Sequence, residues 1–393
     1  MSTVTIIGGA GLVSRGVAYD LASDDSIEEI RIADIDAEGA KKVALEANRI
    51  AGWKKAAASR IDVLKKKESL SVLKGTDFIV NGVQYDFNLE VMDLALKAGS
   101  HYLDFGGLYW MTKKQLRLNG AFRKAGLLGI AGMGAEPGLS GVLASSLCGG
   151  MESVDTIKIR DAWRDNTKGV PPFFVTWSIQ TLMDEYTMPA EIFEDGLIRR
   201  VDPLSMKESY DFPVPVGTTE VFVTRHSEVA TFPGSFRKKG IRKVNWMEGG
   251  PGFIEQKLLA DAGFADGEPL RIGGCEISPR RFLTDLLKKK GLLGYPDKAR
   301  IESVECLCVE VSGIEKGETA MKRATCVFPS KPEWGLGAAE YSVCMPAAVA
   351  VRHVLSGKVA ERGVKPPEVL FDTECFISDL RQKGFRIGVE KIE

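Results

Sequence analysis

The sequence contains few residues of the kinds that form metal sites or disulfide frameworks. Its 393 residues include three histidines, at positions 101, 226 and 353, which lie far apart in the chain. No metal-ligand spacing stands out among them, so we expect no bound metal. Seven cysteines, an odd number scattered over a long chain, do not form a disulfide framework. Cys306 and Cys308 alternate in the apolar run IESVECLCVEV, which predicts two buried structural thiols on one face of a strand.

The chain also lacks an excess of charge and a long apolar run. Lysine and arginine total 52 and aspartate and glutamate total 53, so no overall field attracts nucleic acid or an anionic membrane. No apolar stretch approaches membrane-spanning length, and a strand-like pattern begins almost at the first residue. We therefore expect no signal or transit peptide and a cytoplasmic location. The length suffices for two domains with sizeable cores.

A glycine cluster follows the first apolar run. Residues 4–34 predict a strand, a tight turn, a helix and a second strand ending in Asp34, which is the order of a dinucleotide-binding βαβ unit. Gly9 can adopt the backbone angles of the turn, and Gly11 lets the backbone approach a pyrophosphate at the start of the helix. Asp34 would accept hydrogen bonds from an adenosine ribose and repel a 2′-phosphate. The expected cofactor is NAD, with NADP as the alternative.

The match to G-x-G-x-x-G is incomplete, because Ser14 replaces the third glycine. Serine is small enough for the close packing of helix and strand that this position requires. A glycine pattern alone is a weak signal, and its place on the first strand of an alternating α/β series strengthens it. The predicted cofactor-binding residues are Gly9, Gly11, Leu12, Val13, Asp34, Asp62, Asn81, Gly82 and Val83.

Later strand ends in the same region predict a ligand cleft. Apolar runs stop close to residues 81, 104 and 135, and in doubly wound sheets ligands bind beyond the carboxyl ends of the strands. We expect the loops 81–88, 104–108 and 135–138 to form one side of the cleft. Trp177 and Arg225, from a second domain, are expected to form the other side.

Several segments together resemble the saccharopine dehydrogenase family. They are IIGGAG near the N-terminus, the loop around Tyr85, HYLDFGG, GMGAEPGLSGVLA and GVKPPE. The stretch PPFFVTWSIQTLMDEYTMPAEIFEDG is similar to the lysine 6-dehydrogenase-like and saccharopine reductase-like branch. The resemblance implies an NAD(P)-dependent enzyme that forms or oxidises a carbon–nitrogen bond in an amino acid or a polyamine.

The pattern after residue 150 is β-rich and predicts a mostly antiparallel α+β domain, and from residue 335 it is helical again. The resemblance implies an α/β protein whose Rossmann dinucleotide-binding domain (1–148) carries an inserted α+β substrate/dimerisation domain (149–334). It also implies that C-terminal helices (335–393) return to the Rossmann domain. The expected partners are a small-molecule substrate and further copies of the chain, in a homodimer or a larger homo-oligomer, without nucleic acid or membrane.

Three residues are candidates for catalysis. Oxidation of an amine to an imine requires a neutral nitrogen, and therefore a base beside it. Through the resemblance, Tyr85 matches a tyrosine beside the nicotinamide, although Gln84 and Asn88 replace a proline and a histidine of that loop; an ordinary half-buried aromatic is the alternative. Asp104 ends a strand at the cleft, where it could hold or deprotonate an amine or cap the two glycines that follow. His226 has an ordinary pKa near neutrality, and a structural role is its alternative.

Five residues are candidates for substrate binding: Gly107, Glu136, Arg164, Trp177 and Arg225. Glu136 occupies the acidic position of the family's G-x-D/E-P-G loop, where substrate contact and helix capping are both open. The planar fork of an arginine suits the carboxylate of an amino acid, with Arg225 as first choice and Arg164 as second. A surface ion pair is the alternative for either arginine.

Three hypotheses for the function remain open from the sequence. The leading one is oxidative deamination of a diamine-type amino acid such as lysine, as in lysine 6-dehydrogenase. The second is a reductive condensation that makes a saccharopine-like or carboxyspermidine-like secondary amine, which needs cations for the substrate carboxylates. The third is a non-catalytic dinucleotide-binding protein.

Overall fold

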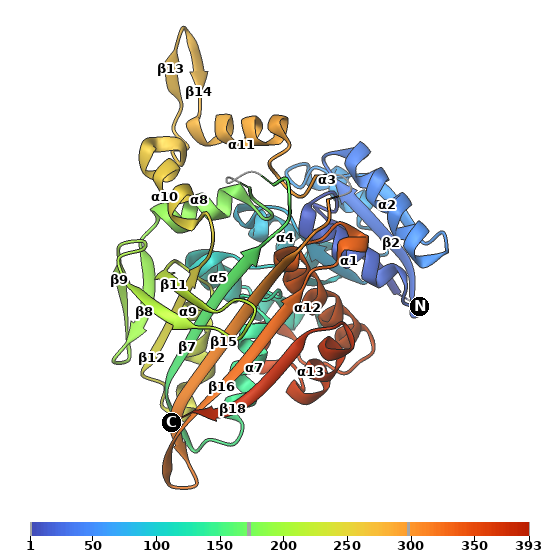
Figure 1. Ribbon diagram of the computed structural model, residues 1–393. Helices are drawn as coiled ribbons and strands as arrows, with labels where there is room; N and C mark the ends of the chain where they lie inside the picture. Colours follow the sequence, from blue (N-terminus) through green and yellow to red (C-terminus); the bar gives the residue numbers. More distant parts are fainter. Residues whose placement is uncertain (1, 171–173, 297–298, 393) are drawn as a thin grey trace.

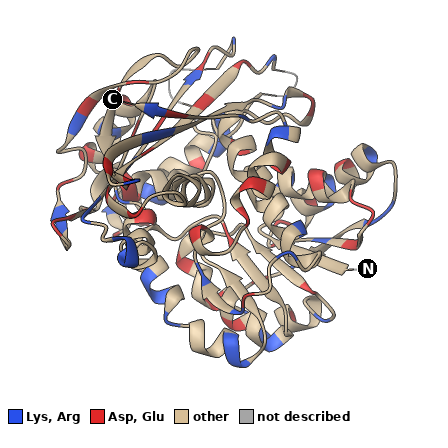
Figure 2. Ribbon diagram, turned by 90° about the horizontal axis from the view of Figure 1, so that it is seen from below, with Lys and Arg blue, Asp and Glu red and all other residues tan. Residues whose placement is uncertain are grey.

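The computed structural model describes residues 2–170, 174–296 and 299–392, which fold around two β-sheets (Figure 1). The first three residues of the PPFF segment lie outside these ranges. Figure 2 shows lysine and arginine interspersed with aspartate and glutamate over the molecule, in agreement with their nearly equal totals of 52 and 53. Across the described ranges, none of the helices has the length and apolar character that a bilayer crossing requires.

The first sheet contains seven parallel strands in the order β17-β6-β5-β4-β1-β2-β3. Their bounds are β1 Ser2–Ile7, β2 Ile27–Asp34, β3 Ala56–Arg60, β4 Phe78–Asn81, β5 His101–Asp104, β6 Leu128–Ile130 and β17 Gly363–Lys365. The chain winds in opposite directions from the boundary between β1 and β4, which is where open α/β sheets bind their ligands. The predicted α/β class with a Rossmann domain is confirmed.

Helices cover both faces of this sheet. They are α1 Leu12–Ala22, α2 Ala37–Ala51, α3 Lys66–Val72, η1 Tyr85–Phe87, α4 Asn88–Ala98, α5 Leu108–Leu116, α6 Asn119–Lys124 and α7 Leu139–Cys148. Local sequence explains several helix ends. The side chain of Asp36 accepts the backbone N–H of Gly39 (3.0 Å) at the start of α2, and Gly52 ends that helix with a φ of 75°.

The second sheet contains nine strands in the order β10-β11-β12-β7-β15-β16-β18, with β8 beside β12 and β9 beside β8. Their bounds are β7 Ser153–Asp165, β8 Ala190–Glu194, β9 Leu197–Val201, β10 Lys207–Asp211, β11 Thr218–Val223, β12 Lys243–Gly249, β15 Ser303–Glu315, β16 Glu318–Pro329 and β18 Arg386–Ile392. β12 runs parallel to β7 and the other neighbours are antiparallel, as expected for an α+β domain. Cys306 and Cys308 are fully buried free thiols in β15, as predicted.

Shorter elements decorate the second sheet. They are α8 Ile179–Thr187, α9 Glu228–Ser235, η2 Arg237–Lys239, α10 Phe253–Leu259, η3 Ala260–Phe264, β13 Leu270–Ile272, β14 Cys275–Ile277, α11 Pro279–Lys290 and η4 Pro332–Trp334. Figure 1 shows that the β13–β14 hairpin projects away from the rest of the molecule, next to α10 and α11.

The C-terminal segment joins both sheets. It contains α12 Ala338–Leu355, β17, η5 Pro367–Val369, α13 Thr373–Gln382 and β18. Helix α12 packs on α1 and also on β15 and β16, so it lies between the two sheets. The sequence pattern indicated the two helices but not the two strands: β17 extends the first sheet beside β6, and β18 pairs with β16 of the second. The segment therefore returns to both domains.

The packing of α1 against α12 requires a glycine. Gly16 faces α12, and a methyl group at this position would clash with Cys344 Sγ and lie 2.9 Å from Leu336 Cδ1. Both neighbours are fully buried, so neither side chain can move into solvent.

We predict that Gly16→Ala destabilises the protein by about 1–3 kcal/mol, because overpacking outweighs the gain in helix propensity. The measurement is the midpoint of denaturant unfolding. Gly120→Ala in α6 is the matched control, since a methyl group there meets nothing within 4 Å and should stabilise the protein by about 0.4–1 kcal/mol. Equal effects of the two substitutions would contradict the close packing of α1 and α12.

Candidate active site

A cavity of about 850 Å³ lies between the Rossmann domain and the second sheet. It extends from the N-terminus of α1, past the carboxyl ends of β4 and β5, to strands β7, β12 and β15. The start of α12 completes its wall with Ala338 and Ala339. The cavity thus opens from the switch point of the parallel sheet, the position at which such sheets bind dinucleotides.

The N-terminus of α1 fits the pyrophosphate of a dinucleotide. Among the described residues, no side chain caps this helix start, and its first turn contains no acidic residue. The backbone N–H groups and the positive end of the helix dipole are therefore available to an anion. A Cβ atom at Gly11 would lie 3.1 Å from the carbonyl oxygen of Gly8, so the tight turn itself favours glycine here.

Ser14 occupies the position of the missing third glycine. It is 1% exposed and packs against Gly82 at the end of β4, where a Cβ atom would clash with Ser14 Oγ. Helix α1 and the end of β4 still approach closely, because the glycine of this contact is Gly82 on the strand side and not residue 14 of the helix.

The candidate cofactor residues divide into two groups. Gly11, Leu12, Val13, Gly82 and Val83 line the cavity, whereas Gly9, Asp34, Asp62 and Asn81 do not. Asp34 accepts the N–H groups of Ala10 (3.0 Å) and Asp36 (2.9 Å), which fixes its carboxylate beside the glycine turn. Asn81 donates to the side chains of Asn88 (2.9 Å) and Tyr102 (3.1 Å) and so shapes the loop after β4.

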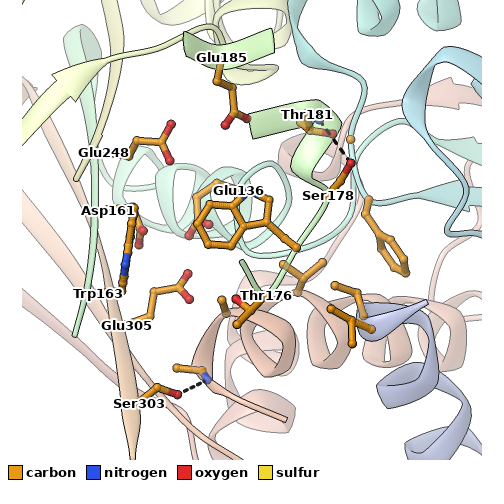
Figure 3. Close-up of a pocket in the computed structure, with 18 of the residues that line it drawn as sticks. Glu136, Asp161, Trp163, Thr176, Ser178, Thr181, Glu185, Glu248, Ser303 and Glu305 are labelled. Carbon is orange, nitrogen blue, oxygen red and sulfur yellow. Dashed lines mark hydrogen bonds between the residues drawn. The ribbon is translucent and has the colours of Figure 1, made fainter. Parts of the chain in front are cut away.

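Five carboxyl groups converge on the other end of the cavity (Figure 3). They belong to Glu136, Asp161, Glu185, Glu248 and Glu305. Strand register explains three of them. Asp161 of β7 lies opposite Glu248 of β12, and Glu305 of β15 lies opposite Trp163, which shares the face of Asp161. Like charges on directly opposite residues destabilise a sheet, so the acids have no structural reason to face one another.

Several of these carboxyl groups lack partners. Oxygen atoms of Glu136, Asp161 and Glu305 lie within 4.8 Å of one another. Glu136 Oε1 and Asp161 Oδ1 are buried without a hydrogen-bond partner in the described part of the chain. By contrast, Glu305 accepts a hydrogen bond from Ser342 (3.3 Å) and Glu248 accepts one from Thr224 (2.6 Å). The unpartnered oxygens are available to a cationic ligand.

Burial raises the pKa of each of the five acids, and their neighbouring carboxylates raise it further. The pKa of Glu305 rises to about 8, and those of Glu136 and Asp161 rise well above their ordinary range. A cation in the cavity would favour the charged forms of these groups. Its binding would therefore be coupled to loss of protons from the cluster.

His226 lines the same cavity. Its ring stacks on Trp246 with 4.0 Å between centroids, and its Nδ1 contacts Glu228 Oε2. Glu228 in turn accepts a hydrogen bond from Ser140 of α7 (2.7 Å), which anchors this pair to the Rossmann domain. Burial lowers the pKa of His226, but the Glu228 carboxylate outweighs burial and the pKa is raised overall. The arrangement suits a proton donor or acceptor with a fixed ring orientation.

Two family descriptions match consecutive parts of the chain. The saccharopine dehydrogenase NADP binding domain matches residues 4–130, and the saccharopine dehydrogenase C-terminal domain matches residues 134–385. The chain belongs to the saccharopine dehydrogenase family. It is an NAD(P)-dependent oxidoreductase, as the resemblance implied.

Individual relatives in this family are distant in sequence. The chain is 23% identical to carboxyaminopropylagmatine dehydrogenase from Synechocystis sp., over 98% of this chain and 96% of that protein. It is 24% identical to carboxynorspermidine synthase from Vibrio alginolyticus, over 81% and 78% of the two chains. Among solved structures, saccharopine dehydrogenase (L-Glu forming) from Saccharomyces cerevisiae shares the fold over all of both chains, with a TM-score of 0.75 and 18% identity. Homospermidine synthase from Legionella pneumophila, in complex with NAD, covers 100% and 91% with a TM-score of 0.67 and 16% identity.

Tyr85 lines the cavity of this saccharopine dehydrogenase family member, but its hydroxyl group is engaged. It donates a hydrogen bond to Asp184 of α8 (2.7 Å), which also pairs with Arg280 of α11 (2.6 Å). Burial and then the Asp184 carboxylate raise the pKa of Tyr85 far above its ordinary value. The geometry favours a link between the domains over the expected role as a base.

Asp104 lines the cavity as well, and its oxygens are bound to the protein. Oδ1 accepts the N–H groups of Gly106 (2.8 Å) and Gly132 (3.1 Å), and Oδ2 accepts a hydrogen bond from Gln115 (2.5 Å). Burial raises the pKa of Asp104 to about 6. Of the two interpretations open from the sequence, these contacts favour capping, although the second N–H group belongs to Gly132 and not to Gly107.

The candidate substrate-binding residues differ in whether they line the cavity. Gly107, Glu136, Arg164 and Trp177 line the cavity. Arg225 does not: its guanidinium group forms a two-pronged ion pair with the buried carboxylate of Glu191 (3.0 and 3.2 Å). The guanidinium group of Arg225, the first choice for carboxylate recognition, is thus already paired with a buried acid from β8. Arg164 contacts Thr219 (2.8 Å) and backbone carbonyls and has no acidic partner among the described residues.

Sequence reasoning missed four of the five clustered acids, namely Asp161, Glu185, Glu248 and Glu305. The sequence contained a signal for two of these four acids. Asp161 and Glu305 each interrupt an apolar strand run at a position where alternation predicts a buried side chain. An acid at such a position requires either a partner or a ligand.

We predict that Asp104→Asn keeps both the fold and most of the turnover. Asparagine Oδ1 can still accept the two glycine amides, and Gln115, whose Oε1 atom has no partner in the described structure, can turn to accept the new N–H group. Turnover should stay far above the roughly 10²-fold loss that follows removal of a general base.

The same substitution should change how stability depends on pH. Because the folded pKa is raised from 3.8 to about 6, Asp104 stabilises the fold fully in acid and loses this contribution as the pH rises through about 6. Denaturant unfolding of Asp104→Asn should therefore show a smaller decline in stability from about pH 4 to 7. A hundredfold loss of turnover would instead return the role of base to Asp104.

Proposed function

We propose that this enzyme interconverts an imine and a secondary amine on a polyamine that carries a single carboxylate, as in a carboxyspermidine-type reductive condensation. The observation that supports this substrate class is the group of five carboxyl side chains around one cavity, with buried oxygens that lack partners. NAD(P) supplies or accepts the hydride when it is bound.

A polycationic substrate explains why the cluster is retained. Burying several carboxyl groups together costs free energy through desolvation and mutual repulsion. Ammonium groups compensate both costs, since each donates three hydrogen bonds and carries the opposite charge. Glu185 comes from helix α8, apart from the strands that carry Asp161, Glu248 and Glu305 (Figure 3), which suits a substrate with more than one cationic centre.

The cations of the cavity favour a substrate with one carboxylate. Among the described lining residues, Arg164 and Lys168 are the basic side chains besides His226, and acids outnumber all three. A saccharopine-like product with several carboxylates would meet repulsion from the acidic cluster. The names of two relatives, carboxyaminopropylagmatine dehydrogenase and carboxynorspermidine synthase, describe carboxylated polyamines and agree with this choice.

Lysine 6-dehydrogenase-like deamination is the second candidate. Lysine also combines a carboxylate with amines, so Arg164 and the nearest acids could bind it. Lysine would leave part of the acidic cluster without a cation. For that reason we rank lysine below a carboxylated polyamine as the substrate.

We propose His226 as the residue that moves the proton. Glu228 holds its ring and raises its pKa, so the imidazolium form can protonate the nitrogen of an imine and the neutral form can take the proton back. Trp163 and Trp177 pack edge to face, with 5.6 Å between their centroids, in the wall of the same cavity.

NAD is the cofactor we expect to be preferred over NADP. The proposal rests on Asp34, whose carboxylate is held by two backbone amides at the end of β2. A negative charge at that place repels a 2′-phosphate and accepts hydrogen bonds from a free ribose.

The projecting arm formed by α10, β13, β14 and α11 supports the expectation of a homodimer. A two-stranded hairpin is marginally stable alone, and this arm exposes several large apolar side chains. They are Ile254, Leu258, Leu270, Ile272 and Phe282. We propose that a second copy of the chain covers them.

We predict that Asp161→Asn and Glu305→Gln each raise KM for a carboxylated polyamine by roughly tenfold or more, because each removes one partner of a buried ion pair. The assay follows the absorbance of the reduced nicotinamide with carboxynorspermidine, lysine and saccharopine, using NAD and NADP. At neutral pH both variants should also unfold at higher denaturant concentration than the unchanged protein, since burial raises the pKa of each carboxyl group and so costs stability above its ordinary pKa, whereas an amide does not titrate.

Glu220→Gln is the matched control for these two variants, because Glu220 is an exposed acid on strand β11 of the same sheet and does not line the cavity. Its KM should be unchanged. A preference for lysine over the polyamine would favour the second candidate. An unchanged polyamine KM in both cavity variants would contradict the role of the acids.

We predict that His226→Gln lowers kcat by roughly 10²-fold or more and leaves cofactor affinity unchanged. Glu228→Gln should move the histidine-dependent limb of the pH–rate profile to lower pH, since the carboxylate that raises the pKa is gone. Cofactor binding, followed by nicotinamide fluorescence, verifies that each variant is folded. Normal turnover of His226→Gln would exclude this histidine as the proton carrier.

A further inference from the structure

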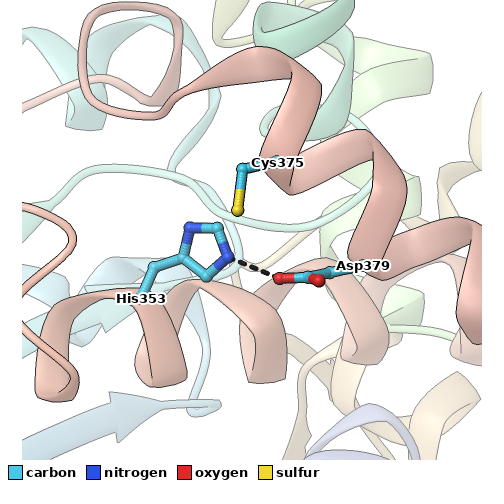
Figure 4. A group of neighbouring side chains, drawn as sticks. All are labelled: His353, Cys375 and Asp379. Atoms are coloured by element: carbon cyan, nitrogen blue, oxygen red, sulfur yellow. Dashed lines mark hydrogen bonds and ion pairs between the residues drawn. The ribbon is translucent and has the colours of Figure 1, made fainter.

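A second cluster of potential ligand side chains lies outside the cavity, between the last two helices. His353 of α12 faces Cys375 and Asp379 of α13, and one ligand atom of each lies within 4.8 Å of the others (Figure 4). None of the three lines the cavity. Nitrogen, sulfur and oxygen donors therefore meet at one point where the proposed reaction does not use them.

The helices fix this arrangement. Cys375 and Asp379 are four residues apart on α13, so both project from one face toward α12. His353 is 2% exposed, and the rings of Phe371 and Phe376 pack edge-on against it at 6.0 and 5.3 Å. His353 Nε2 lies 2.7 Å from Asp379 Oδ2. The imidazole is thus held in place before any ligand binds.

The cluster already holds a positive charge. Lys358 Nζ lies 3.3 Å from Cys375 Sγ and 3.7 Å from Asp379 Oδ2. Its side chain is 49% exposed, so it can turn into solvent and leave the same position to another cation.

We propose that His353, Cys375 and Asp379 bind one Zn²⁺ ion, with water as the fourth ligand. Zinc accepts this mixture of donors in tetrahedral sites, with a Zn–S distance of about 2.3 Å and a Zn–N distance of about 2.0 Å. The partly exposed side chains of Cys375 and Asp379 can close on the fixed imidazole to reach these distances. The ion would tie α12 to α13 and stabilise the segment that joins both sheets.

The donor set distinguishes this site from the acidic cavity. Glu136, Asp161 and Glu305 offer oxygen alone, which suits hard cations and ammonium groups. A thiolate ligand selects softer metals such as zinc and its spectroscopic substitute cobalt. No spacing of the three histidines indicated a metal in the sequence, because the other two ligands come from a different helix.

The test uses the full-length protein after treatment with a chelator. Dialysis against micromolar Zn²⁺, followed by elemental analysis, should show one retained ion, and Co²⁺ should give a thiolate-to-cobalt charge-transfer band. Cys375→Ser should abolish the band, and Asp379→Asn should weaken metal binding about tenfold or more. Cys275→Ser is the matched control, since Cys275 is an exposed thiol on β14, and it should bind metal normally.

A second measurement does not depend on the folding of variants. Zinc should slow the alkylation of Cys375 in the unchanged protein, measured by peptide mass spectrometry, and leave the alkylation of Cys275 unaffected. The proposal would be overturned if the protein retained no ion, or if zinc did not slow the alkylation of Cys375. It would also be overturned if Asp161→Asn removed metal binding and Cys375→Ser did not.

Discussion

The packing of α12 between the two sheets is the contact on which the arrangement of this protein depends. Gly16 lets α1 approach α12, and Arg352 near the end of α12 pairs with Asp20 and Asp24 (2.6 Å to the latter). The first residues of α12 then form part of the cavity wall. Helix α12, which is distant in sequence from α1, therefore helps to position the second sheet and its acidic residues relative to the dinucleotide site.

The cavity is bounded by two different kinds of contact. On the side of α12, apolar residues from both sheets form one continuous core. On the side of α8, the link between domains is polar, through Tyr85, Asp184 and Arg280. Close-packed apolar contacts resist displacement more than a few hydrogen bonds do. The rigid side carries Glu305 and the start of α12, and the polar side carries Glu185.

The acidic cluster is an unfavourable arrangement for the stability of the fold. Asp161 and Glu248 face each other across neighbouring strands, and the surroundings provide few hydrogen bonds to offset their burial. A sheet selected for stability alone would place apolar or oppositely charged residues there. By contrast, Arg225 and Glu191 form a buried ion pair away from the cavity.

The sequence by itself determined what depends on local order along the chain. Residues that are close together in the sequence determine the glycine turn, the alternation of strands and helices, and the α+β character of the second domain. They also form the family motifs. Tertiary structure alone decided which distant residues meet. The five acids come from a loop, one helix and three strands, Arg225 is taken by Glu191, and His353 meets Cys375 and Asp379 across two helices. Such contacts depend on strand register and on the return of the C-terminal segment, and a single sequence carries no periodic signal for either.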